Sequence, residues 1–282
     1  MQSHTATVPQ GEILESQRTP DFWVIDRNLP RWARRSNPVV RRHLGGFLAV
    51  PIPETGLMVR LIAAQLLIIV LSFAIPTTLE FVALVGLVSL LAIPFSLGAY
   101  AGALFAIGRA ATDFMFMERA SRTLDTLRTT PLTTRTILQA KIAAAIWKQA
   151  LNLDTVILSA AVFSLPIITI QWATLYDPSK MPIPARVGIM AGLVATMLRL
   201  VLEPLMVGAL GVLVGSVTNL RFVGAMWTGL LTAAYFVLIN LPRLGIIPWH
   251  NRLIIESILP VVLPPLITLA ALRLTITLLH RE

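Results

Sequence analysis

Six long apolar segments follow one another along most of the chain and constrain its fold more than any other feature. They run over residues 61–75, 81–107, 153–173, 187–215, 222–241 and 253–279, with short polar turns between several of them. Most approach or exceed the roughly 20 residues that a helix needs to cross a bilayer, and they lack the alternating pattern of an outer-membrane barrel. Only 13% of the residues are charged, against about 25% in soluble proteins. The sequence therefore predicts an all-α polytopic membrane protein with six transmembrane helices.

The distribution of lysine and arginine predicts the orientation of these helices. If both termini are cytoplasmic, eighteen of the 23 basic residues fall on the cytoplasmic side and Arg199 falls within a span. The four that remain outside are Lys180, Arg186, Arg243 and Arg252. Basic residues concentrate in cytoplasmic loops, so we expect a multi-pass protein of the plasma membrane, in a prokaryote the cytoplasmic membrane, with both termini inside. The net charge of +9 belongs to these loops and does not indicate binding to nucleic acid.

Residues 1–55 form a basic cytoplasmic or interfacial segment ahead of the transmembrane domain, which we place at residues 56–282. The first 50 residues contain no apolar core of the kind that a cleavable signal peptide has. Aromatic and aliphatic side chains are mixed there with arginines, as in segments that lie in a membrane interface. Each such arginine gains about 1 kcal/mol from anionic lipid headgroups, and the clustered ones are Arg31, Arg34, Arg35, Arg41 and Arg42. The alternative is a basic flank that only sets the topology.

A polar segment at residues 109–141 separates the second apolar segment from the third. Each of its charges would cost about 2.5 to 3.5 kcal/mol at the centre of a membrane helix, so the segment belongs on the cytoplasmic side. Apolar residues recur in it at spacings of three and four, which predicts a helix over residues 113–128. Pro131 then suits the first turn of a second helix that leads into the third span, with Thr130 as its N-cap.

The polar segment contains a series of short motifs: Glu118-Arg119, Thr123-Leu124-Asp125, Leu127, Thr130-Pro131-Leu132, Ile137-Leu138 and Lys141. Their order and spacing resemble those of type 2 ABC transporter permeases, the transmembrane subunits of ABC exporters. Upstream, Asn37-Pro38-Val39 resembles the N-P-V motif that often precedes the first span in that family. Six spans with both termini inside also match. The chain departs from the family pattern at Arg122 and Ala140, where glycine is usual, and at Asp125, where glutamate is.

The resemblance implies a mechanism. A permease of this family pairs with a second permease copy, identical or related, and presents a cytoplasmic coupling helix to a separate ATPase subunit that binds ATP-Mg. The residues implied for this contact are Glu118, Arg119, Arg122, Leu124, Asp125, Leu127 and Pro131. None of the lysines of this chain ends a glycine-rich phosphate loop. We therefore expect a subunit that is not itself an enzyme and binds no cofactor directly.

Within the apolar segments, Arg199 and Glu203 lie four residues apart, just before Pro204. This spacing lets the two side chains form an ion pair on one helix face. Ionisable groups inside a membrane are functional by default, but a neutralised pair that steadies a kinked helix or a dimer contact is the simpler interpretation. The spans show no other polar path, so the substrate that we expect is amphipathic or lipid-like rather than a small ion.

Catalytic and metal sites have no support in the sequence. There is no cysteine, and the four histidines are scattered among terminal and loop positions without metal-ligand spacing. Two functions remain open. The first is the permease subunit of an ABC exporter for an amphipathic substrate. The alternative is a permease-derived structural or accessory subunit of a larger membrane complex that has no transport activity.

Overall fold

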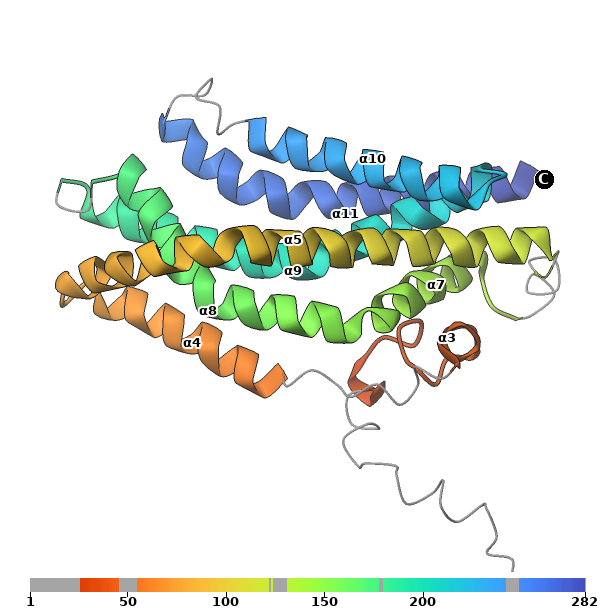
Figure 1. The fold of residues 1–282 in the computed structure, drawn as a ribbon, viewed down its shortest axis with the longest axis horizontal. Helices are drawn as coiled ribbons and strands as arrows, with labels where there is room; N and C mark the ends of the chain where they lie inside the picture. Colours follow the sequence, from red (N-terminus) through yellow and green to blue (C-terminus); the bar gives the residue numbers. More distant parts are fainter. Residues whose placement is uncertain are drawn as a thin grey trace, which may run out of the picture.

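The computed structural model describes residues 26–45, 55–121, 123, 131–177, 180–241 and 249–281. The regular elements in this part of the chain are α3 (Pro38–Leu44), α4 (Thr55–Leu71), α5 (Thr77–Ala120), α7 (Thr134–Lys148), α8 (Ala150–Leu175), α9 (Pro182–Val217), α10 (Arg221–Asn240) and α11 (Trp249–Arg281). The long helices share one main direction and form an elongated bundle (Figure 1). The prediction of an all-α fold is confirmed for the described residues.

Five of the described helices, α5 and α8 to α11, are long and apolar enough to cross a membrane. This finding supports a multi-pass membrane protein. The first predicted span differs, because α4 has only 17 residues. Helix α4 ends at Leu71, and the chain passes through a turn to Pro76 before α5 begins. The structure therefore supports five spanning helices, and the sixth span stays a prediction.

Helix α9 lies in the middle of the bundle, with α5 packed along one side and α11 along another. The close approach of α5 and α9 depends on glycine. A Cβ atom on Gly211 would lie 2.5 Å from the carbonyl oxygen of Gly108, and one on Gly215 would lie 2.6 Å from that of Thr112. Small residues four apart let membrane helices pack backbone against backbone. These glycines therefore fix how α9 sits on α5.

Replacing Gly211 with leucine is expected to force α5 and α9 apart and to lower the free energy of unfolding by about 1–3 kcal/mol, as overpacking does. The matched control is Gly102→Leu in α5, where an added Cβ atom meets nothing within 4 Å. Gly102→Leu should leave the free energy of unfolding unchanged or raise it slightly, because leucine has a higher helix propensity than glycine. Thermal unfolding in a mild detergent measures both variants. Equal losses would contradict the packing role of Gly211.

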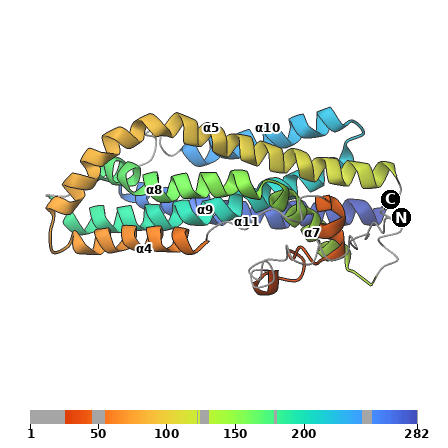
Figure 2. The same cartoon turned by 60° about the horizontal axis from the view of Figure 1, so that its bottom comes forward.

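The first part of the polar segment 109–141 belongs to α5. We predicted a separate helix over 113–128, but α5 continues from Thr77 to Ala120 as one helix. Pro94 lies inside α5, and the helix changes direction in its first half (Figure 2). A proline within a helix removes one backbone hydrogen bond and bends the axis. The charged residues at the far end of α5 are thus carried on a direct extension of a membrane helix.

The return helix, α7, begins later than the sequence predicted. Its N-cap is Thr133 rather than Thr130, and the Thr133 hydroxyl accepts a hydrogen bond from the backbone N–H of Thr136 at 3.3 Å. Helix α7 does not run unbroken into the next span, because Gln149 separates it from α8. Most residues between α5 and α7 lie outside the described residues. The predicted coupling helix therefore stays a prediction.

The described part of the N-terminal segment, residues 26–45, packs against α7 and shares the main core of the bundle. Val39 and Leu44 of α3 are buried in the same cluster as residues of α5, α7 and α9. Asn37 caps α3, since its side chain accepts a hydrogen bond from the backbone N–H of Val39 at 2.9 Å, and Pro38 occupies the first turn. The N-P-V residues thus build the start of a short docked helix.

Arg35 is held inside this segment rather than at its surface. Its guanidinium carbon lies 4.2 Å from the ring centroid of Trp147 in α7, and Nε1 of Trp147 donates a hydrogen bond to the carbonyl of Ala33 at 2.8 Å. Burial lowers the pKa of Arg35 from its usual value, and the carboxylate of Asp26 opposes that shift. This corrects the prediction that Arg35 faces lipid headgroups.

Candidate functional site

A buried charged cluster of His43, Glu118 and Lys141 joins α3, α5 and α7. All but a small part of Glu118 is buried, and Lys141 is completely buried. Nζ of Lys141 forms an ion pair with Oε2 of Glu118, and Nε2 of His43 lies 3.0 Å from Oε1. Each of the three helices contributes one residue. The Glu118 carboxylate therefore ties the N-terminal segment to the far end of α5 and to the return helix.

Apolar side chains surround this Glu118 cluster. The His43 ring stacks on Phe114, with centroids 4.3 Å apart, and Nζ of Lys141 lies 3.3 Å from Sδ of Met115. Burial lowers the pKa of Lys141 below its usual value, while the carboxylate of Glu118 opposes the shift. In such surroundings the loss of one charge leaves the other unpaired, which costs more than the intact pair contributes.

The cluster corrects the role that we predicted for Glu118. The sequence placed Glu118 toward an ATPase subunit, but its carboxylate is buried between α5 and α7. Arg119 is partly exposed and Pro131 is exposed, so both can still face a partner. The remaining predicted contact residues lie outside the described residues; they are Arg122, Leu124, Asp125 and Leu127. Lys141, which the family pattern contains, is the residue that holds Glu118 inside.

The arginines predicted to face lipid headgroups divide into two groups. Arg31, Arg41 and Arg42 are exposed. Arg34 is half-buried, and its side chain donates hydrogen bonds to backbone carbonyl groups of the same segment, at 2.8 and 3.0 Å. With Arg35 packed on α7, three of the five predicted residues remain at the surface. These three form a smaller basic surface than the sequence alone suggested.

A second buried cluster lies among the long helices and is centred on Glu203 of α9, which is fully buried. Nε of Arg199, one turn earlier, lies 2.7 Å from Oε1 of Glu203. The hydroxyl of Tyr235 in α10 donates to Oε1 at 2.8 Å, and the hydroxyl of Tyr100 in α5 donates to Oε2. The predicted ion pair is present. It belongs to a larger Glu203 cluster that links α5, α9 and α10.

Reasoning from the sequence missed the two tyrosines of this cluster. The chain has only three tyrosines, and two of them meet at one carboxylate. A buried tyrosine needs a partner for its hydroxyl, so a tyrosine inside an apolar segment was the available signal. Glu203 accepts three hydrogen bonds here, and a carboxylate offers about four lone-pair sites. The network therefore satisfies the buried charge more completely than the arginine alone would.

A further polar contact joins α4 to α9 at the end of the bundle that lies away from α3 (Figure 1). We placed Arg186 in an outside loop, but it is buried in the first turns of α9. Its Nε and Nη2 donate to the carbonyl oxygen of Ser72, at 3.2 and 2.7 Å, and its guanidinium carbon lies 4.9 Å from the ring centroid of Phe73. The arginine thus satisfies a carbonyl group just past the end of α4.

Within the described residues, no group of three or more histidine, aspartate or glutamate side chains is placed to hold a metal ion. Comparisons with known protein families, with curated proteins and with solved structures found no match for this chain. The features that bear on its function are therefore the two buried clusters, the helices that they connect and the pattern of the polar segment.

Proposed function

We propose that this chain is the permease subunit of an ABC exporter, and that it acts with a second permease copy and a separate ATPase subunit that binds ATP-Mg. One observation carries the proposal. Helix α5 extends beyond its apolar part as a single helix, the chain returns through α7, and the Glu118–Lys141 ion pair joins the two helices at their base. A displacement of the segment between them is then transmitted along α5 into the membrane helices.

The arrangement of the bundle supports the same proposal. Helix α3, the far end of α5, α7 and the C-terminal end of α11 lie at one end of the bundle (Figure 1). Basic residues are most frequent in the segments at this end, as expected for a cytoplasmic face. In the proposal α4 is the first of six spans, and its 17 residues match the lower limit for a helix that crosses a bilayer.

The exposed faces of the long helices favour an amphipathic or lipid-like substrate. Large apolar side chains dominate these faces; examples are Leu91 and Phe95 on α5, Val201 on α9 and Leu230 on α10. A small ion needs a series of polar ligands to replace its hydration shell. An amphiphile needs an apolar surface, which these faces would offer to its hydrocarbon part.

Charge reversal between α5 and α7 tests the ATPase contact. Arg122→Glu combined with Asp125→Arg is expected to abolish copurification of a nucleotide-binding ATPase in mild detergent, because the resemblance implies that both positions lie in the coupling segment. The matched control is Lys180→Glu, which reverses an exposed charge in the turn before α9. Mass spectrometry identifies the copurified chains, and phosphate release measures stimulation of the ATPase.

The outcome separates the two functions. An ATPase that copurifies with the wild type and with Lys180→Glu, but not with the double variant, supports an exporter. Unchanged copurification together with unchanged ATPase stimulation in the double variant contradicts the coupling role. Isolation of the wild-type chain with other membrane subunits and without an ATPase supports the alternative, an accessory subunit of a larger complex.

A further inference from the structure

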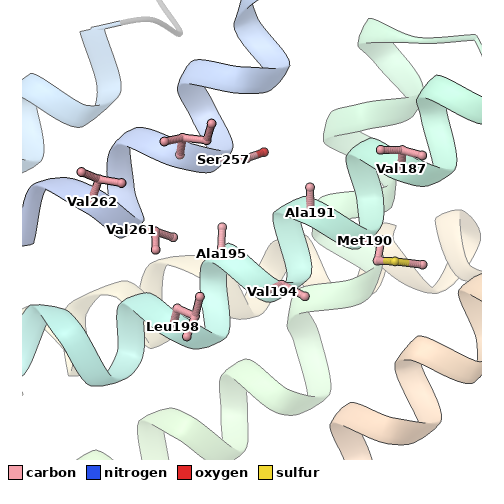
Figure 3. A pocket seen from close by; sticks show the side chains of 10 residues that line it. Val187, Met190, Ala191, Val194, Ala195, Leu198, Ser257, Val261 and Val262 are labelled. Atoms are coloured by element: carbon pink, nitrogen blue, oxygen red, sulfur yellow. The ribbon is translucent and has the colours of Figure 1, made fainter.

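An apolar groove of about 530 Å³ opens between α9 and α11. Figure 3 shows its walls: Ala195 and Leu198 on α9 point toward α11, and Val261 on α11 points toward α9. Among the residues that line the groove, only Ser257 has a polar side chain. Both helices are long and apolar enough to cross a membrane, so the medium that reaches the groove is lipid hydrocarbon. A hydrocarbon chain is the occupant that matches these walls.

Along α9, Arg199 lies between the residues that line this groove and the Glu203 cluster. On α9 it directly follows Leu198 and lies one turn after Ala195, both of which line the groove. Glu203 lies one turn further along the same helix. Because residues four apart share a helix face, Arg199 stands between an apolar wall and a buried carboxylate. Its side chain is 23% exposed, whereas that of Glu203 is completely buried.

The guanidinium of Arg199 has donors that its ion pair does not use. An arginine carries five N–H donors; in the described part of the chain Nε of Arg199 donates to Glu203, and Tyr235 is a second side-chain partner of the guanidinium. The carboxylate is shared with Tyr100 and Tyr235. A partly exposed arginine on a membrane helix is costly unless its remaining donors find acceptors. An oxyanion supplies two acceptors in the geometry of the guanidinium fork.

We propose that α9 and α11 form a binding site for a single-chain anionic amphiphile, whose hydrocarbon chain lies in the groove and whose oxyanion headgroup contacts Arg199. Carboxylate and phosphate headgroups share this chemistry. As a statement about the exported substrate, this inference rests on the proposed function. The binding step itself needs no ATPase, so it is tested on the isolated full-length chain.

Photolabelling of the purified chain in lipid nanodiscs tests the site. The probe is palmitic acid with a diazirine in its chain, and the comparison is the corresponding neutral alcohol. We expect saturable labelling of α9 and α11, with the acid reaching half-saturation at about tenfold lower concentration than the alcohol, because a hydrogen bond between charged groups contributes at least that factor. Peptide mapping by mass spectrometry locates the label. Non-saturable labelling spread over all helices contradicts a built site.

A matched pair of variants tests the groove. Val194 lines the groove on α9 and is 45% exposed, while Val162 lines a different groove, beside α8, and is 47% exposed. Val194→Trp is expected to abolish labelling of α9 and α11 by both probes, and Val162→Trp to change neither. Val262→Trp fills the same groove from α11 and should repeat the effect of Val194→Trp. Thermal unfolding checks that each variant is folded.

Two further variants test the headgroup contact. Glu203→Gln removes the competing carboxylate charge and is expected to strengthen labelling by the acid relative to the alcohol. Arg199→Met combined with Glu203→Gln removes both charges, so no lone charge stays buried, and should bring the acid to the level of the alcohol. The proposal is overturned if neither variant changes labelling by the acid relative to the alcohol. It is also overturned if α9 and α11 are still labelled in Val194→Trp and Val262→Trp. If labelling occurs as expected but no ATPase copurifies with the chain, the exporter function is contradicted and the binding site is not.

Discussion

Lys141→Met is expected to destabilise the protein by about 3–5 kcal/mol, the usual cost of removing one partner from a buried ion pair. Methionine keeps a long, unbranched side chain, so the packing around α7 changes little. The substitution leaves the Glu118 carboxylate buried, with Nε2 of His43 still 3.0 Å from Oε1. The shift in the midpoint of thermal unfolding in mild detergent measures the loss.

Removing both charges separates the effect of charge from that of shape. Glu118→Gln combined with Lys141→Met replaces the pair by neutral side chains and should recover most of the loss, because neutral packing often stabilises as well as a buried pair does. His43→Gln is the milder control, since Lys141 still pairs with Glu118. If the double variant is as unstable as Lys141→Met alone, the shape of Lys141 and not its charge holds α7 to α5.

The apolar segments predicted the long helices well because a backbone inside lipid must satisfy its hydrogen bonds within the helix. The polar ends were harder to predict. Helix α5 continues to Ala120, past the limit that we set at residue 107. Charged residues stop a segment from entering lipid, but they do not stop a helix. For the same reason the start of α4 at Thr55 lies before the apolar segment that was predicted to begin at residue 61.

The two clusters show which contacts a local pattern reveals. Arg199 and Glu203 lie four apart on one helix, so their spacing was sufficient to predict the ion pair. Glu118 and Lys141 lie on different helices, and His43 comes from a third. Only the packing of α3 and α7 on the end of α5 brings them together. A charge in a polar segment is usually solvated, and no neighbouring residue indicates that the carboxylate of Glu118 turns inward.

Inside the bundle, Arg199→Met is expected to be the most damaging single change, at about 3–5 kcal/mol. It leaves the fully buried Glu203 carboxylate with two tyrosine hydroxyls and no positive charge. Glu203→Gln should cost less, about 1–3 kcal/mol. Glutamine still accepts hydrogen bonds from both tyrosines, and the side chain of Arg199 is 23% exposed rather than completely buried. Thermal unfolding of the two variants side by side measures the difference.

Which of the two variants loses more stability shows which lone charge is the more deeply enclosed. Both variants remove one charge from the same pair, so the contribution of the pair itself cancels when they are compared. What remains is the difference in free energy between two lone charges. One is a carboxylate enclosed by α5, α9 and α10, and the other is a guanidinium whose side chain is 23% exposed. A larger loss in Glu203→Gln than in Arg199→Met would mean that Arg199 is enclosed in the folded protein. An enclosed Arg199 would have no exposed N–H donors for an anionic amphiphile, so that result would also contradict the proposed binding site.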